Sequence, residues 1–146
     1  MALIDDAVAG ELRKAFAALV HPVRLAVFSD GAASGAGTED ADEVRQLVAE
    51  LAALDPRLTV EAHGAELEGE SARELGIERG PAIAVLGERI DHGVRFYGLP
   101  GGYEFGTLVE AVLDVSRGDS GLAAETREAL AALESGVRIR VFSTPT

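Results

Sequence analysis

The feature that most constrains this chain is a strand, a glycine-rich loop and a helix within residues 23–54. Residues 23–30 are nearly all apolar, which is typical of a strand buried on both faces. The helix is expected to begin near Asp40, because Asp40 and Glu43 stand three residues apart, as in a capping box. The loop Gly31–Gly37 contains only glycine, alanine and serine. In α/β proteins, a loop between a strand's carboxyl end and a helix N-terminus usually carries the chemistry.

Hydrophobic periodicity divides the first part of the chain into alternating helices and strands. Ser71 and Glu74 indicate a second capping box, with Gly76 just after the short helix that they begin. A βαβ unit and a hairpin, covered by helices, predict an α/β protein with a mixed four-stranded sheet. This order is typical of the thioredoxin fold, here with an extra N-terminal helix. Helices are expected at Asp5–Leu19, Asp40–Leu54, Ser71–Leu75 and Tyr103–Ser116, and strands at Val23–Asp30, Leu58–His63, Ala82–Leu86 and Val94–Tyr97.

The C-terminal part of the chain begins the same pattern again. Residues 137–143 read Val-Arg-Ile-Arg-Val-Phe-Ser and match residues 23–29, Val-Arg-Leu-Ala-Val-Phe-Ser, at five positions. Such self-similarity indicates an internal repeat. A helix is therefore expected at Leu122–Leu133 and a strand at Val137–Phe142. The predicted domains are a thioredoxin-like domain at 1–119 and, at 120–146, a helix and strand that begin a second, truncated thioredoxin-like unit.

Composition excludes several classes of function. The 146 residues include no cysteine, which rules out disulfides, thiol nucleophiles and thiolate metal sites. A net charge of −12 argues against nucleic acid and against anionic membrane surfaces as partners. Residues 1–6 lack the basic region and apolar run of a signal peptide, and no segment approaches the length of a membrane span. A cytoplasmic location is expected.

Four segments carry a resemblance to a known family. They are Ala41–Leu47, Gly76–Ile83, Arg95–Phe105 and Val115–Leu122. With them, nearly the whole chain resembles the protein disulfide oxidoreductases, glutaredoxin-like proteins built from two tandem thioredoxin folds. The ending Val141–Thr146 is similar to the family's approach to its second Cys-x-x-Cys. A related pattern occurs in the N-terminal region of the flavoprotein subunit of alkyl hydroperoxide reductase, where one of two tandem thioredoxin folds lacks its cysteines and serves as scaffold.

The chain departs from this family at the position of the reactive thiols. The family often carries Cys-x-x-Cys at the start of the helix that holds residues 41–44. Aligned by that helix, Thr38 and Ala41 occupy the two cysteine positions, and the Gly31–Gly37 loop is longer than usual. Disulfide exchange needs a thiolate, which a hydroxyl cannot replace. The resemblance therefore implies no catalytic residue in this chain.

Pro81 is the feature of the family's site that this chain keeps. The resemblance implies that Pro81 is the cis-proline facing the active-site loop in thioredoxin folds. The backbone of the preceding residue there pairs with an extended substrate peptide, a form of strand addition. Gly80 and Pro81 are thus the expected substrate-binding residues. The alternative is that the cis bond persists only because the turn needs it.

Other chemistry finds less support in the residues. Gly35-Ala36-Gly37 resembles part of a dinucleotide-binding motif, but acidic residues follow it where a pyrophosphate would bind. The acids at 39–43 are explained by helix capping and lack the ligand pattern of a calcium loop. His21, His63 and His92 lie on separate elements without metal-ligand spacing. No cofactor and no metal are therefore expected.

The sequence predicts a redox-inactive thioredoxin- or glutaredoxin-like domain of a protein disulfide oxidoreductase, which scaffolds or holds a protein or peptide substrate. The alternative is a stand-alone protein-binding or assembly module without a redox role. The family has thiol–disulfide oxidoreductase activity, but this chain alone is expected to be inactive. An unpaired strand at Val137–Phe142 would expose apolar side chains and open backbone groups, which invites association. A homodimer through residues 120–146 is therefore expected.

Overall fold

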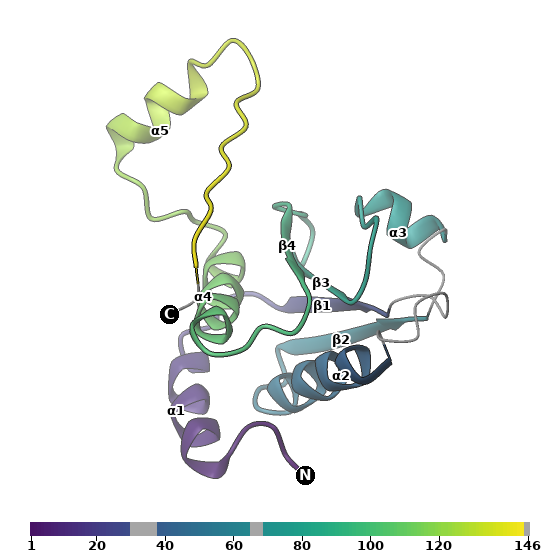
Figure 1. The fold of residues 1–146 in the computed structure, drawn as a ribbon. Coiled ribbons are helices and arrows are strands. Elements are labelled where there is room, and N and C mark those ends of the chain that lie inside the picture. Colours follow the sequence, from purple (N-terminus) through teal and green to yellow (C-terminus); the bar gives the residue numbers. More distant parts are fainter. Residues whose placement is uncertain (30–37, 65–68, 145–146) are drawn as a thin grey trace.

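The computed structural model describes residues 1–29, 38–64 and 69–144. It confirms an α/β architecture in which helices flank a mixed four-stranded sheet (Figure 1). In chain order the elements are α1 (Asp6–Phe16), β1 (Val23–Phe28), α2 (Thr38–Ala52), β2 (Leu58–His63), α3 (Glu70–Glu74), β3 (Ala82–Gly87), β4 (Val94–Tyr97), α4 (Tyr103–Arg117) and α5 (Ala124–Ala131). The strands follow the order β2-β1-β3-β4 across the sheet.

The central strand β1 pairs on both of its edges, parallel to β2 and antiparallel to β3, while β3 also pairs antiparallel with β4. Alternate side chains of β1 enter two separate apolar clusters, because successive residues of a strand point to opposite faces. Leu25 and Val27 join the large cluster, whereas Ala26 and Phe28 join the small one. This double burial explains why the sequence of β1 is almost entirely apolar.

The two clusters differ in size and in the helices that contribute to them. The large cluster holds nineteen buried residues and draws on α1, α2 and α4. The small cluster holds seven, four of them alanines, and its only helical buried residue comes from α3.

Among the described residues, no helix is both long enough and apolar enough to cross a membrane.

Polar side chains fix two junctions that periodicity alone did not predict. The Arg57 guanidinium donates hydrogen bonds to the carbonyls of Phe16 (2.9 Å) and Leu19 (2.6 Å) and is held by the Asp55 carboxylate at 2.7 Å. It thereby joins the last residue of α1 to the turn that follows, where the Phe16 carbonyl also accepts a hydrogen bond from the amide of Leu19 at 3.0 Å. Helix α1 ends at Phe16, three residues before the expected Leu19, although Leu19 remains buried.

A second junction ties α4 to the start of β1. The Ser116 hydroxyl is buried and accepts hydrogen bonds from the amides of Val20 (2.9 Å) and His21 (3.1 Å). It donates to the carbonyl of His21 at 2.7 Å. One side chain therefore satisfies three backbone groups in the connection between α1 and β1.

Two expected helix caps were wrong. Helix α2 begins at Thr38, so Asp40 lies inside its first turn and is not its cap. The N-cap of α3 is Gly69, without a side-chain hydrogen bond, and Ser71 lies inside that helix. In both cases the helix starts earlier than the nearest capping pattern, and an acidic residue in the first turn still interacts favourably with the helix dipole. Gly76, expected just beyond α3, has the positive φ of +65° that favours glycine there.

The C-terminal extension differs most from expectation. Helix α5 spans Ala124–Ala131 instead of Leu122–Leu133, and no strand forms at Val137–Phe142. Every described residue from Arg117 onward is exposed. Figure 1 shows α5 standing away from the sheet, with the chain then returning toward α4. A strand requires a hydrogen-bonded neighbour, and no other strand of the described chain lies against this segment.

Candidate functional site at the end of the central strands

Three strands meet at the carboxyl end of β1. Phe28, the last residue of β1, is opposite His63 at the end of β2 and opposite Ala82 at the start of β3. Pro81 directly precedes Ala82, so the Gly80–Pro81 bond lies at this same end of the sheet. The start of α2 follows the loop that leaves β1 here. The topology thus brings the two predicted substrate-binding residues to the place where an α/β fold usually keeps its site.

The Gly80–Pro81 peptide bond is cis, as the resemblance to the disulfide oxidoreductases implied. Pro81 is buried, and its carbonyl accepts a hydrogen bond from the amide of Gly98 at 2.8 Å, which continues the pairing of β3 with β4. Gly80 is partly exposed, and neither its N–H nor its C=O has a hydrogen-bond partner among the described residues. Within residues 1–29, 38–64 and 69–144, no group occupies the backbone hydrogen-bonding positions of Gly80.

A cation lies beside this open backbone. The guanidinium of Arg79 sits over the ring of Tyr97, 4.6 Å from its centroid. Tyr97 ends β4 opposite Ala82, so the pair flanks the Gly80–Pro81 bond. Cation–π contacts of this kind favour one orientation of an otherwise flexible arginine. The guanidinium of Arg79, the residue that precedes Gly80, is thus held on the ring of Tyr97. Sequence reasoning did not single out either Arg79 or Tyr97.

The N-terminus of α2 carries no thiol at this site. Thr38 opens the helix, and Ala41, at the second cysteine position of the family, is only 5% exposed. Ser29 follows β1 and is buried, where its hydroxyl accepts a hydrogen bond from Arg45 at 3.3 Å. Arg45 also forms an ion pair with Asp42 on the same helix. The Gly31–Gly37 loop, in which dinucleotide binding was considered, lies outside the described residues.

His63 is an additional site residue, which sequence reasoning had considered only as a metal ligand. Its ring stacks on Phe28, with centroids 4.5 Å apart and planes 6° from parallel. Its Nε2 is buried without a hydrogen-bond partner in the described part of the chain. The carboxylate of Glu61 lies 3.9 Å from this nitrogen and accepts a hydrogen bond from Arg24 at 2.8 Å. A stacked aromatic pair therefore lies on one face of the sheet, where β1 and β2 end.

The other two histidines lie elsewhere. His21 and His92 line one hollow together with residues 87–90, next to the end of α4. Within residues 1–29, 38–64 and 69–144, no three histidine, aspartate or glutamate side chains gather as metal ligands would.

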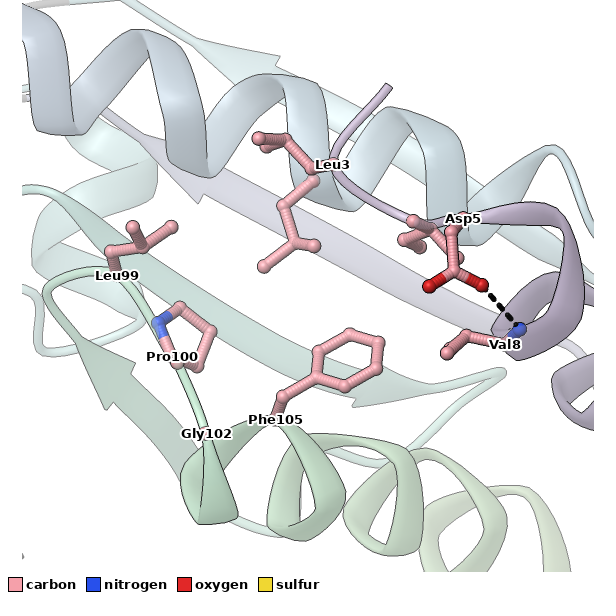
Figure 2. Close-up of a pocket in the computed structure, with 10 residues that line it drawn as sticks. Leu3, Asp5, Val8, Leu99, Pro100, Gly102 and Phe105 are labelled. Atoms are coloured by element: carbon pink, nitrogen blue, oxygen red, sulfur yellow. Dashed lines mark hydrogen bonds between the residues drawn. The ribbon is translucent and has the colours of Figure 1, made fainter. Parts of the chain in front are cut away.

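A separate apolar pocket of about 370 Å³ lies between the N-terminal segment, α2 and the start of α4 (Figure 2). Its carboxylate, Asp5, already accepts a hydrogen bond from the amide of Val8 at 2.8 Å as the cap of α1. The carboxylate of Glu50, on α2, accepts hydrogen bonds from the amides of Leu3 and Ile4, two residues that line the pocket. A Gln46 hydrogen bond and these amides lower the pKa of Glu50. The pocket is lined by Leu3, Ile4, Asp5, Val8, Leu47, Leu99, Pro100, Gly101, Gly102 and Phe105.

The apolar pocket offers shape but no reactive group, because its one charged side chain is engaged in capping α1. In the described part of the chain, the end of the sheet offers the unpartnered backbone groups of Gly80 and, beside Gly80 in sequence, Arg79. The order of the strands in the mixed sheet and the helices that flank it define the class of the protein: it has a thioredoxin fold.

No protein-family model matches the chain. Two curated proteins, both the alkyl hydroperoxide reductase component AhpF, show the relationship in sequence. The chain is 29% identical over 141 residues, 96% of its length, to AhpF of Pseudomonas putida, of which it covers 24%. It is 33% identical over 84 residues, 58% of its length, to AhpF of Staphylococcus aureus (strain Mu50 / ATCC 700699), of which it covers 14%. The chain thus spans a quarter or less of the length of these relatives.

Two solved structures show the same relationship in three dimensions. The NTD_N/C domain of alkylhydroperoxide reductase AhpF from Enterococcus faecalis (V583) has a TM-score of 0.75 and 29% identity, covering 88% of this chain and 60% of that one. A protein disulfide oxidoreductase from Aeropyrum pernix K1 has a TM-score of 0.76 and 28% identity, covering 91% and 56%. The chain is therefore a cysteine-free thioredoxin-like domain related to these two groups of proteins.

Proposed function

We propose that this domain holds a protein segment or a neighbouring domain and does not itself exchange disulfides. One observation carries the proposal: the 146-residue chain contains no cysteine. Exchange proceeds by attack of a thiolate on a disulfide sulfur, so a chain without sulfur nucleophiles cannot form the mixed disulfide. Thr38 and Ala41, at the family's cysteine positions, provide a hydroxyl and a methyl group instead.

The Gly80–Pro81 edge supports the holding role. An extended segment that binds a sheet edge uses backbone hydrogen bonds for affinity and neighbouring side chains for selectivity. Gly80 has a free N–H and a free C=O among the described residues, and Arg79 supplies a positive charge beside them. We therefore propose that the preferred segment is extended and carries a carboxylate near the residue that pairs with Gly80.

The alternative function is a stand-alone protein-binding or assembly module without a redox partner. It would use the same edge, so binding alone does not separate the two proposals. The gene's reading frame after the Thr146 codon does: a continuation into Cys-x-x-Cys favours the oxidoreductase scaffold, and a stop codon favours the stand-alone module. The cytoplasmic location expected from the sequence stays a prediction.

The absence of redox activity is tested by the reduction of insulin with dithiothreitol. We expect the same rate with the folded protein as with a heat-inactivated sample, because neither contains a thiol. Catalysis above the heat-inactivated control would refute the proposal.

The holding role is tested with a permanently unfolded polypeptide, S-carboxymethylated α-lactalbumin, whose modified cysteines carry carboxylates. Fluorescence anisotropy should show saturable binding that weakens severalfold in Arg79→Ala. Arg89→Ala is the matched control, because it removes the same charge from an exposed position that lines the His21–His92 hollow. Its affinity should equal that of the wild type. Equal weakening in both variants would indicate a nonspecific charge effect, and no binding to the wild type would reject the holding role.

A further inference from the structure

The apolar pocket between the N-terminal segment, α2 and the start of α4 is a hollow that the function proposed for the sheet end does not use. Its volume is about 370 Å³. Small-molecule sites in proteins span roughly 300–1,000 Å³ and are lined mostly by apolar side chains with a few polar groups. An apolar cavity of about 150 Å³ already holds a benzene molecule. The pocket therefore has room for two fused aromatic rings with a short side chain.

Hydrogen bonds fix one wall of this pocket in place. The amides of Leu3 and Ile4 donate to the carboxylate of Glu50 at 2.9 and 2.8 Å. The side-chain amide of Gln46 donates both to the carbonyl of Met1 and to Glu50. Two side chains of α2 thus hold the N-terminal segment against that helix. A wall that is already ordered lowers the conformational entropy that a ligand must remove when it binds.

Apolar side chains around the pocket remain partly open to water. Leu3 is 44% exposed, Val8 is 40% exposed and Leu99 is 38% exposed. Figure 2 shows these three side chains around the same space as the ring of Phe105. A ligand that filled this space would remove apolar surface from water, which favours binding. The body of a fitting ligand is therefore apolar.

Asp5 is the only charged residue among the described residues that line the pocket. One oxygen of its carboxylate accepts the hydrogen bond from the amide of Val8, whereas the other has no hydrogen-bond partner in the described part of the chain. Figure 2 shows this carboxylate at the edge of the space between Leu3 and Phe105. A carboxylate only accepts hydrogen bonds, and a charged donor forms a stronger bond with it than a neutral donor. The polar group of a fitting ligand is therefore a cationic donor.

We propose that this pocket binds a small apolar amine. The apolar body of the amine lies among Leu3, Leu99 and Phe105, and its ammonium group donates a hydrogen bond to Asp5. The net charge of −12 on the chain also favours a cation over an anion. This inference does not rest on the function proposed for Gly80 and Pro81.

Tryptamine, an indole with a short alkylammonium group, is a suitable probe. The chain contains no tryptophan, so indole fluorescence reports the probe alone. Fluorescence anisotropy should show saturable binding of tryptamine. Uncharged 3-methylindole and anionic indole-3-propionate should each bind about fivefold more weakly or less, because they lack the ammonium group. The proposal would be overturned if tryptamine did not saturate, or if either comparison compound bound as tightly as tryptamine. Tighter binding of the anion would mean that the helix N-termini at the pocket outweigh Asp5.

Asp5→Asn tests the role of the carboxylate. Asparagine caps a helix about as well as aspartate, so α1 keeps its cap while the charge is removed. The affinity for tryptamine should fall about fivefold, and the affinity for 3-methylindole should stay the same. Asp6→Asn is the matched control, because it removes the same charge from an exposed neighbour that does not line the pocket. The control should bind tryptamine as the wild type does. Equal affinities of the wild type and Asp5→Asn, or equal losses in the two variants, would refute the proposal.

Methyl NMR of the wild type locates the site without any variant. Addition of tryptamine should shift the methyl signals of Leu3, Val8 and Leu99. The methyl signals of Leu130, which is exposed on α5 and does not line the pocket, should stay in place. Unmoved signals at the three pocket residues, or an equal shift at Leu130, would count against the pocket as the binding site.

Discussion

Replacing Ser116 with alanine removes the side chain that anchors the start of the central strand. The Ser116 hydroxyl makes three hydrogen bonds to the backbone of Val20 and His21, at 2.9, 3.1 and 2.7 Å. At about 1 kcal/mol each, their loss would cost about 3 kcal/mol. The higher helix propensity of alanine returns about 0.5 kcal/mol. Water can also reach the peptide groups of the exposed residues 20 and 21, so we expect a net loss of about 2 kcal/mol in the free energy of unfolding.

Urea unfolding measures this change. With a slope of about 2 kcal/mol per molar urea, the Ser116→Ala midpoint should fall by about 1 M while the slope is unchanged. Ser120→Ala is the control, because Ser120 is exposed and its hydroxyl accepts only a long hydrogen bond of 3.3 Å from Leu122. That control should stay within about 0.5 kcal/mol of the wild type. Equal midpoints for Ser116→Ala and the wild type would refute the reasoning that the buried hydroxyl organises this junction.

Two further predictions concern acid stability and the position of the missing thiol. Hydrogen bonds from Arg57 lower the pKa of the Asp55 carboxyl in the folded protein. A carboxyl whose pKa is lower in the folded than in the unfolded chain stabilises the fold at pH values above its unfolded pKa of about 3.9. This stabilisation is lost as the pH falls through the folded-state pKa. Asp55→Asn should therefore lower the midpoint temperature of thermal unfolding at pH 7, and this midpoint should then fall less steeply as the pH is lowered. The same steepness in Asp55→Asn and the wild type would contradict this. A cysteine at the buried position 41 should react with Ellman's reagent far more slowly than one at the exposed position 143. The matched variants Ala41→Cys and Ser143→Cys measure this difference in the folded protein. Equal reaction rates would show that position 41 is open to solvent.

The sequence sufficed for the part of the fold that depends on local periodicity. The apolar run of β1 indicated double burial, and the structure confirms it in two clusters. The βαβ unit and the hairpin predicted a mixed four-stranded sheet, which the structure confirms. Gly80 and Pro81 were placed by resemblance to the disulfide oxidoreductases, and the cis bond was confirmed. Their role in substrate binding stays a prediction.

The contacts that sequence reasoning missed join residues far apart in the chain. Arg57 reaches the carbonyls of α1, and Ser116 lies 95 residues from His21, so no local pattern indicates either contact. The stacking of His63 on Phe28 depends on the register of β1 against β2, which periodicity does not fix. The strand expected at 137–142 failed for another reason: its pattern is that of a strand, but the strand's partner is missing from the described chain.

The inequality of the two apolar clusters has a consequence for motion. The small cluster rests on the five-residue helix α3 and on four alanines, Ala26, Ala72, Ala82 and Ala84, so little apolar area holds that face closed. Regions with few buried apolar contacts open at a lower free energy than the whole molecule. Amide hydrogens of α3 should therefore exchange with solvent well before those of α2 or α4. Only residues 75–79 separate α3 from Gly80. A segment that bound at Gly80 and ordered this layer would therefore pay a free-energy cost for the ordering, and the exchange of α3 would slow when the edge is occupied.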